Sequence, residues 1–523
     1  METETLLITI CYESSKKLSN KKFNNWIAKE AFSHDFADGK GVIKLKKPVE
    51  RIIDKNGFRD SETLTSIVLP DSLTEIGERA FTLCKTLSSV VIPKSVKKIN
   101  DFAFTGCARL TSIDIPNSVT EIGFRAFGDC IGLTSIVIPD SVKIIDDSAF
   151  KDSTTLASVV ISKCATKIGN YAFMGCTSLT SVVIPESVKE IGEYAFSGCT
   201  SLTSVVFSDS VTEIGEDAFS NCVNLTSITV DKNNPKYDSR DNCNAVIETK
   251  SKKLICGCAG TVIPDSVKKI GDNAFVKCSG LTSIVIPNSV TKIGENAFWG
   301  CTSLTSVNIS NSVTEIDWSA FSNCTNLTSI VIPNSVKRIN GYAFLGCSLT
   351  SIVIPDSVTK IGPGPFCNCR KLTSIIVDKN NPKYDSRNNC NAIIETKTNK
   401  LICGCANTVI PDSVKVIDWL AFHGQTSLTS IVIPNSVKRI GSSAFGECSG
   451  LVSLVIPESV TEIDESAFSG CSSLVSVVIP DSVKKIGDFA FYGCDNLSEE
   501  TKERIRSIQE SSKSKAEQQY FIE

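Results

Sequence analysis

Residues 179–201 read LTSVVIPESVKEIGEYAFSGCTS, and close variants of this 23-residue unit fill most of the 523-residue chain. The phenylalanine of the unit recurs every 23 residues from Phe58 to Phe219, and again from Phe275 to Phe344. Self-similarity at a short fixed period is the signature of a solenoid, in which each repeat forms one coil and packs on its neighbours. The sequence therefore predicts one elongated repeat domain rather than several globular domains.

The pattern within the unit predicts which side chains point into the coil. The segment LTSVVIP is rich in β-branched residues, as expected of a strand, and Pro185 suits the end of that strand because it has no amide hydrogen. We expect Ser187 to bond the turning backbone and Gly192 to permit the turn that follows. A single coil cannot bury its apolar side chains alone, so neighbouring coils must stack. The expected inward residues are Leu179, Val182, Ile184, Val188, Ile191, Ala195, Phe196 and Cys199.

The repeated pattern resembles the treponemal-type leucine-rich repeat of the BspA-like family, LxxIxIPxSVxxIGxxAFxxC, over about residues 49–498. The resemblance implies a right-handed leucine-rich-repeat superhelix of about 17–19 coils with a parallel β-sheet on its concave face. Characterised members of the family are bacterial and protozoan surface proteins that bind host matrix proteins or other bacteria, whereas many others have no assigned role. The resemblance is therefore specific for the fold and much less so for the function.

The repeat divides the chain into three parts. Residues 1–48 do not fit the pattern, and we expect an N-terminal cap there, with a strand over Leu6–Cys11 and a short amphipathic helix over Lys22–Phe32. The first coil of a solenoid exposes an apolar end that must be covered. Residues 49–498 form the solenoid, and residues 499–523 are predicted to form a C-terminal capping helix and tail. An independent module at the start and a partner-binding helix at the end are the alternatives.

Two intervals of 56 residues interrupt the period, Phe219–Phe275 and Phe366–Phe422. They contain the similar segments 231–261 and 378–408, both of which begin with DKNNPKYDSR. In each segment two short apolar runs flank a polar, lysine-containing turn, which is the pattern of a β-hairpin. We interpret them as two β-hairpin insertions that serve either as contact sites or as tolerated surface insertions.

Most of the 23 cysteines occupy one position of the repeat, three residues after the recurring phenylalanine. Ser153 and Gln425 take this position in two coils without leaving a partner cysteine unpaired. A buried cysteine behaves as a small hydrophobic residue. The pattern therefore predicts reduced core thiols rather than disulfide bonds, and it favours a reducing compartment. The cysteines at this position are Cys84, Cys107, Cys130, Cys176, Cys199, Cys222, Cys278, Cys301, Cys324, Cys347, Cys369, Cys448, Cys471 and Cys494.

Composition and motifs argue against an enzyme, a metal site and a nucleic-acid partner. The 54 basic and 57 acidic residues give a net charge of -3, which creates no basic field for phosphate backbones. The only histidines, His34 and His423, are far apart in the sequence. The chain therefore offers few residues for histidine-dependent nucleophilic catalysis. The cysteine clusters at 243–258 and 390–405 offer three thiols each, whereas structural zinc usually takes four ligands. We therefore expect no cofactor.

The N-terminal segment and the hydropathy of the chain bear on its location. The first residues, METETLLITICYESSKK, are acidic where a signal peptide carries positive charge. No run of about 18 apolar residues predicts a membrane span. We therefore expect a soluble, unprocessed, cytoplasmic protein. Export to the cell surface by a non-classical route is the alternative.

The candidate partner-binding site is the residue that points outward from the predicted strand LTSVVIP, which is Val183 in the quoted unit. A row of valines along a sheet is an extended apolar surface of the kind that marks interaction sites, although β-branched side chains also stack favourably in a sheet without any partner. Polar residues interrupt the row in three coils, where a specific contact would be most easily distinguished. The candidate residues are Val68, Val91, Asp114, Val137, Val160, Val183, Val206, Thr229, Val285, Asn308, Val331, Val353, Ile376, Val432, Val455 and Val478.

These observations predict a non-enzymatic protein-binding scaffold that acts through the concave sheet face and the inserted hairpins. Its partner is expected to be a protein whose identity the repeat does not reveal. The alternative, which the family resemblance implies, is a BspA-type cell-surface adhesin that binds host or bacterial surface proteins.

Overall fold

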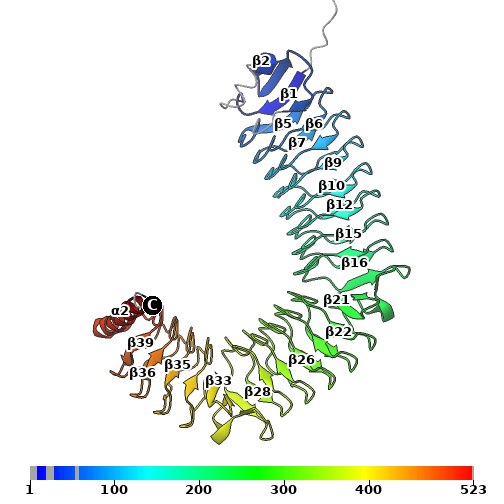
Figure 1. The fold of residues 1–523 in the computed structure, drawn as a ribbon. Coiled ribbons are helices and arrows are strands. Elements are labelled where there is room, and N and C mark those ends of the chain that lie inside the picture. The colour runs from blue at the N-terminus through cyan, green and yellow to red at the C-terminus, as the bar shows by residue number, and fades with distance from the viewer. Residues whose placement is uncertain (1–8, 19–28, 53–57, 521–523) are drawn as a thin grey trace, which may run out of the picture. The chain divides into compact units, whose positions relative to one another are not determined.

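The computed structural model describes residues 9–18, 29–52 and 58–520, and these form a β-solenoid of stacked coils (Figure 1). The coils fall into two compact units, which are described separately. The N-terminal unit comprises residues 1–251 and 255–261, and the C-terminal unit comprises residues 252–254 and 262–523. Both consist of short parallel strands stacked coil on coil, so the predicted leucine-rich-repeat solenoid is confirmed.

The first strand of each coil carries the outward valine position. It pairs in parallel and in register with the next coil, so that Val183 lies opposite Val206 and Val206 opposite Thr229. These strands are β5 (Leu64–Val68), β7 (Ser89–Val91), β10 (Ser135–Val137), β12 (Ser158–Val160), β14 (Ser181–Val183), β16 (Ser204–Phe207) and β18 (Ser227–Val230) in the N-terminal unit. In the C-terminal unit they are β23 (Ser283–Ile286), β25 (Ser306–Ile309), β28 (Ser351–Ile354), β30 (Ser374–Val377), β36 (Ser453–Val455) and β38 (Ser476–Val478).

A second strand of only two residues follows in each coil, and the sequence pattern did not predict it. Ile191 pairs in parallel with Ile168 of the preceding coil and Ile214 of the next. In the N-terminal unit these strands are β4 (Arg51–Ile52), β6 (Glu75–Ile76), β8 (Lys98–Ile99), β9 (Glu121–Ile122), β11 (Ile144–Ile145), β13 (Lys167–Ile168), β15 (Glu190–Ile191) and β17 (Glu213–Ile214). In the C-terminal unit they are β22 (Lys269–Ile270), β24 (Lys292–Ile293), β26 (Glu315–Ile316), β27 (Arg338–Ile339), β29 (Lys360–Ile361), β34 (Val416–Ile417), β35 (Arg439–Ile440), β37 (Glu462–Ile463) and β39 (Lys485–Ile486).

Three antiparallel strands precede the first coils. β3 (Lys40–Leu45) pairs with β1 (Thr9–Ser14) and with β2 (Ala31–Ala37), and β1 also pairs antiparallel with β5. The predicted strand over Leu6–Cys11 overlaps β1, although its first three residues lie outside the described part. Most of the predicted helix over Lys22–Phe32 also lies outside it. Ala31 and Phe32, the last two residues of the predicted helix, belong to strand β2, so the helix does not extend to Phe32.

The last coil is followed by helix α2 (Glu499–Tyr520). The backbone amide of Thr501 donates to the Ser498 hydroxyl at 3.2 Å, which caps the start of the helix. Ile505 and Ile508 are buried, and Arg504 pairs with Asp481 of the last coil at 2.6 Å. The helix thus covers apolar surface at this end of the C-terminal unit, where Figure 1 shows it beside β39.

The two long segments contain further strands. In the N-terminal copy these are β19 (Tyr237–Asp238), the 3-10 turn η1 (Arg240–Asn242), β20 (Ala245–Glu248) and β21 (Lys253–Gly257). In the C-terminal copy they are β31 (Tyr384–Asp385), η2 (Arg387–Asn389), β32 (Ala392–Glu395) and β33 (Lys400–Gly404). There β32 pairs antiparallel with both β31 and β33, and β33 then joins the second sheet by pairing in parallel with β34. The segment thus continues the solenoid through its last strand.

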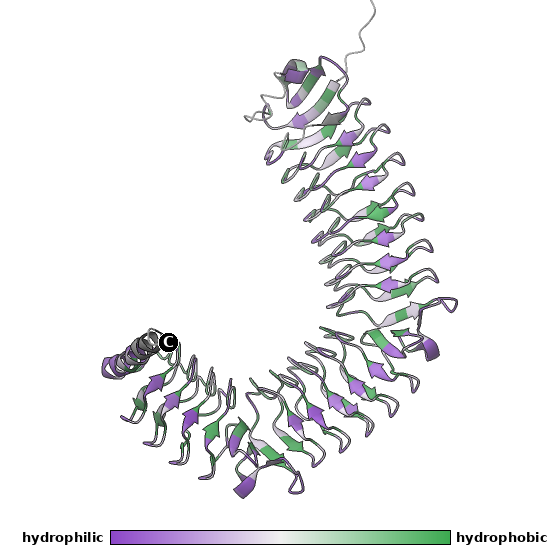
Figure 2. Ribbon diagram, viewed as in Figure 1, coloured by the Kyte–Doolittle hydropathy of each residue, from purple (hydrophilic) through white to green (hydrophobic). Residues whose placement is uncertain are grey.

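The core follows the predicted inward pattern. All eight inward residues of the unit 179–201 are at most 4% exposed. The recurring phenylalanines stack from coil to coil, with the ring centroids of Phe173 and Phe196 5.3 Å apart and their planes 8° from parallel. Figure 2 shows apolar and polar segments recurring along the coils. Because each coil buries its apolar side chains only against its neighbours, the stacking supplies the core.

The cysteines of the repeat donate hydrogen bonds as well as filling the core. The thiol of Cys199 donates to the carbonyl of Phe173 in the preceding coil, at 3.3 Å. Ser153 stands at the same position in another coil, and its hydroxyl donates to the carbonyl of Phe127 at 2.8 Å. A buried carbonyl without a donor costs free energy. The position therefore favours a small donor, which explains why serine can replace cysteine there.

Gly192 has a different role from the one expected. It does not adopt a positive φ. A Cβ at Gly192 would instead lie 2.6 Å from the backbone nitrogen of Asn170 in the preceding coil. The close approach of the neighbouring coil limits the side chain at Gly192, whereas other coils carry asparagine or aspartate at the equivalent position, as at Asn100 and Asp146. The left-handed backbone lies further along, at Tyr194 (φ 53) and Gly198 (φ 74).

We predict that replacing Cys199 by serine preserves more stability than replacing it by alanine. Serine keeps a donor for the carbonyl of Phe173, whereas alanine leaves that buried carbonyl unsatisfied at a cost of about 1–3 kcal/mol. Urea unfolding followed by circular dichroism measures the difference. An alanine variant as stable as the serine variant would show that the thiol acts only by packing.

We also predict that the thiols differ sharply in reactivity. Burial raises the pKa of the Cys84, Cys130 and Cys448 thiols to about 12, and the neutral thiol is a poor nucleophile. Cys11 and Cys164 are exposed. Iodoacetamide at pH 8 should label these two first, and the repeat cysteines only after unfolding. Mass spectrometry of the unreduced, denatured chain should then count 23 free thiols. A shortfall of more than a few would contradict a reduced core.

Candidate functional site

The predicted outward residues form a continuous feature of the first strands in each unit. Val183 is 74% exposed, whereas its chain neighbours Val182 and Ile184 are 4% and 3% exposed. This alternation follows from the strand, in which successive side chains point to opposite faces. All sixteen candidate residues are exposed. Together with two residues described next, we call them the valine stripe.

Sequence reasoning missed two members of the stripe, Val262 and Val409. Both are 72% exposed and begin the coil that follows a hairpin segment. Their coils lack the usual LTS before the valine, so the strand pattern is incomplete there. The following residues IPDSV are the same as in other repeats, and aligning them would have placed both valines in the stripe.

The three polar breaks lie in the same row as the valines. Thr229 lies opposite Val206, and Asn308 lies opposite Val285, each in register on neighbouring strands. Asp114 is exposed in a coil without a first strand. The breaks therefore change the chemistry of the stripe without displacing it.

The first-strand sheet is interrupted in both units. Within the described residues, the segments 110–115, 327–332 and 428–433 form no strand, although they carry the same inward pattern. Val331 and Val432, from two of these segments, are 79% and 83% exposed, the highest values among the aliphatic residues of the stripe. A coil that lacks ladder hydrogen bonds to its neighbours leaves more of its outward side chain uncovered.

Two grooves flank Val432 in the C-terminal unit. One of about 810 Å³ lies toward Val409 and is also lined by Ile431, Ile433 and Asp412. The other, of about 630 Å³, lies toward Val455. Its lining includes Leu454, Ile456, Glu458 and Val478. The grooves are therefore aliphatic along the stripe and carry carboxylates at their edge.

The carboxylates belong to a second exposed row, which follows the strand at the corner of each coil. We call it the corner row. In the N-terminal unit it consists of Asp71, Lys94, Asn117, Asp140, Lys163, Glu186, Asp209 and Lys232. In the C-terminal unit it consists of Asp265, Asn288, Asn311, Asn334, Asp356, Lys379, Asp412, Asn435, Glu458 and Asp481. The row is thus mixed in charge in both units, and it is only acidic or neutral from Asp412 to Asp481.

The second strands carry a partly exposed flank of mixed charge. Lys98 pairs with Glu121 of the next coil at 2.8 Å, and Lys167 pairs with Glu190 at 2.6 Å. These side chains are exposed, so each pair contributes little to stability. The flank is therefore a poor candidate for a recognition site.

The duplicated DKNNPKYDSR sequence holds the long segments to the solenoid. The side-chain amide of Asn234 donates to the carbonyls of Ser208 and Val211 in the preceding coil, at 2.9 and 2.8 Å. Asn381 makes the equivalent pair of hydrogen bonds in the second copy. Arg387 donates to Asp385 from its Nε at 2.7 Å. The shared residues thus have a structural role, and any contact role falls on the exposed turns.

The cysteine clusters of these segments do not assemble a metal site. Within the described residues, no three histidine, cysteine, aspartate or glutamate side chains gather in a way that would hold a metal ion. The thiol of Cys258 donates to the carbonyl of Asn244 at 3.2 Å, and that of Cys405 donates to Asn391 at 3.4 Å. Burial raises the pKa of Cys243 to about 11. These thiols are therefore engaged as neutral donors.

The two histidines lie in different units. His34 is hydrogen-bonded to the hydroxyl of Tyr12 at 2.7 Å, and partial burial lowers its pKa. Burial also lowers the pKa of His423.

In the described part of the chain, no helix is long and apolar enough to cross a membrane.

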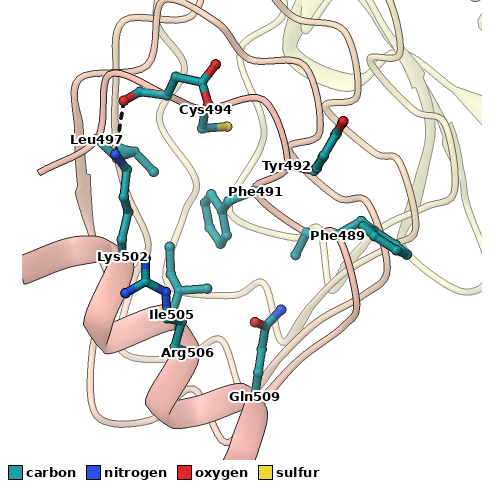
Figure 3. A pocket seen from close by; sticks show the side chains of 11 residues that line it. Phe489, Phe491, Tyr492, Cys494, Leu497, Lys502, Ile505, Arg506 and Gln509 are labelled. Atoms are coloured by element: carbon teal, nitrogen blue, oxygen red, sulfur yellow. Dashed lines mark hydrogen bonds between the residues drawn. The ribbon is translucent and has the colours of Figure 1, made fainter. Parts of the chain in front are cut away.

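A smaller pocket of about 290 Å³ lies between helix α2 and the last coil (Figure 3). Phe491 and Leu497 line it from the coil, and Ile505 and Arg506 line it from the helix. The pocket marks incomplete packing of the helix against the coil, and it lies apart from the stripe residues named above.

A family model described as the BspA type leucine rich repeat region matches residues 51–179, 166–245, 254–373 and 393–516. Among solved structures, the chain is similar to a leucine rich cell surface protein from Faecalibacterium prausnitzii, with 34% identity, 66% of this chain and 86% of that chain covered, and a TM-score of 0.49. A leucine-rich repeat protein from Bacteroides ovatus is 25% identical, with 88% and 83% covered and a TM-score of 0.34. One from Eubacterium ventriosum is 21% identical, with 79% and 91% covered and a TM-score of 0.41.

No curated protein shows significant sequence similarity to the chain. The family model nevertheless matches well over half of the residues, in the segments that the structure shows as stacked coils. The chain therefore belongs to the BspA-type leucine-rich repeat family.

Proposed function

We propose that this chain is a non-enzymatic protein-binding scaffold whose principal contact surface is the valine stripe. One observation carries the proposal: consecutive coils expose an aliphatic side chain at the same position while they bury nearly all their other aliphatic residues. Val137, Val160, Val183 and Val206 are between 51% and 74% exposed. A contiguous apolar surface of this kind marks an interaction site more often than scattered apolar residues do.

The shape and charge of the surface favour a protein over other ligands. Small-molecule sites are concave and enclose most of their ligand, whereas the stripe is an extended row on open strands. The flanking serines and threonines, such as Ser181 and Thr180, are exposed and offer hydrogen bonds at the edge. An apolar centre with a polar rim is the usual anatomy of a protein interface. The exposed turns of the inserted hairpins, at 249–252 and 396–399, would supply additional contacts.

The triple variant Val137→Lys, Val160→Lys and Val183→Lys tests the proposal. The three charges should abolish binding of the partner, because an unpaired lysine in an apolar interface must be desolvated. The fold should remain intact because the three side chains already face solvent. Pull-down from the source organism, with the wild-type chain as reference, measures the effect, and circular dichroism checks the fold.

The matched control is Ile131→Lys with Ile144→Lys. These residues are 49% and 51% exposed, similar to several stripe valines, but lie outside the stripe. The control should bind as the wild type does. Undiminished binding by the folded triple variant, or equal loss in the control, would count against the stripe as the contact surface.

A BspA-type cell-surface adhesin is the second candidate, and membership of the family supports it. In this role the same stripe would bind a host or bacterial surface protein, and the chain would be displayed outside the cell. The cytoplasmic location expected from the sequence stays a prediction, to which the comparisons lend no support. The two candidates thus differ in location rather than in contact surface.

Protease shaving of intact cells separates the two. If the chain is a surface adhesin, it should disappear on shaving while a cytoplasmic marker protein survives. If the chain and the marker both survive, and both are degraded only after lysis, the intracellular scaffold is supported and the adhesin is contradicted.

A further inference from the structure

We infer that the two grooves beside Val432 bind a basic, aliphatic peptide segment of a partner protein. This inference rests on the proposed function and adds the chemistry of the partner. It concerns the C-terminal unit alone, where the stripe opens into grooves and the corner residues beside them, Asp412, Asn435 and Glu458, are acidic or neutral.

The aliphatic part of the inference comes from the groove lining. Val432 is the most exposed aliphatic residue of the stripe, and it lines both grooves. Val409 and Val455 are 72% and 65% exposed on either side. Small branched side chains of a partner would fit between these valines and bury apolar area on both surfaces. Burial of this kind supplies affinity at about 25 cal/mol per Å².

The basic part comes from the edge of the grooves. Asp412 lines the first groove and Glu458 lines the second, and neither groove is lined by a lysine or arginine. Asp481 further along the corner row is already paired with Arg504 of helix α2. Asp412 and Glu458 have no ion-pair or hydrogen-bond partner within the described residues. A lysine or arginine of the partner would supply the missing opposite charge.

The N-terminal unit provides an internal contrast. Its corner row contains Lys94 and Lys163, and the carboxylate of Asp140 already accepts a hydrogen bond from the backbone amide of Lys163 at 2.8 Å. The same valine stripe there is bordered by mixed charge. Charge complementarity therefore directs a basic segment to the grooves, where the corner residues are Asp412, Asn435 and Glu458, while the apolar stripe is common to both units.

Fluorescence anisotropy on the full chain tests this with three labelled twelve-residue peptides. One alternates lysine and valine, one alternates glutamate and valine, and one alternates lysine and serine. The lysine–valine peptide should bind about tenfold more tightly than either of the others, and added salt should weaken it.

Variants of the chain then locate the site. Val432→Ser with Val455→Ser should weaken the lysine–valine peptide about tenfold by removing apolar contact without adding charge. Asp412→Asn with Glu458→Gln should weaken it about fivefold and reduce its salt dependence. The matched control, Ile131→Ser with Ile144→Ser in the N-terminal unit, changes exposed residues outside the stripe and should leave its affinity unchanged.

The remaining outcomes overturn the inference in distinguishable ways. Equal binding of the lysine–serine peptide would mean that charge alone attracts the probe. The glutamate–valine peptide could bind as tightly as the lysine–valine peptide, and lose this affinity in the variant with Val432→Ser and Val455→Ser. That result would refute the basic partner but leave the stripe as a protein-binding surface. Equal loss in the N-terminal control, or no binding of the lysine–valine peptide, would refute the groove as its site.

Discussion

Backbone hydrogen bonds between neighbouring coils are the constraint on which the rest of the structure depends. The amide of Phe196 donates to the carbonyl of Ala218 in the next coil, and that of Gly192 donates to Ile168 in the preceding one, both at 2.8 Å. Buried amides must be satisfied, and here the donors and acceptors lie one repeat apart. The repeat length is therefore held near 23 residues. The shorter coil before Phe366 absorbs its lost residue between Cys347 and Leu349, and its ring still stacks on Phe344 at 5.5 Å.

A fixed repeat also determines where recognition can arise. Each inward side chain lies next to the equivalent side chain of the next coil, as the phenylalanines and cysteines do. Substitutions at the inward positions are therefore poorly tolerated. The outward positions have no such restriction. The valine stripe stays nearly uniform, whereas the corner row varies from coil to coil between acidic, basic and neutral residues. The structure thus combines a general apolar surface with a local charge pattern, and the proposed selectivity for a basic partner rests on the charge pattern.

The sequence allowed the inward residues and most of the stripe to be predicted, because both follow from the alternation of a strand and recur in every coil. It did not reveal the two-residue second strands, since Glu190 and Ile191 show no alternating run. The role of Gly192 was predicted wrongly, because a close approach between coils leaves no trace in a single repeat. The interrupted strand at 428–433 depends on hydrogen-bond geometry rather than residue type. The grooves beside Val432 could therefore be found only in the structure.

The most direct test of the central claim, that the stripe is the contact surface, is site-specific photo-crosslinking in living cells. A photoreactive amino acid placed at Val183 or Val432 should form a crosslink to a partner protein, because both side chains face outward on the stripe. The same group at Ile144, which is exposed outside the stripe, should not. Crosslinks from Ile144 and none from the two stripe positions would contradict the account.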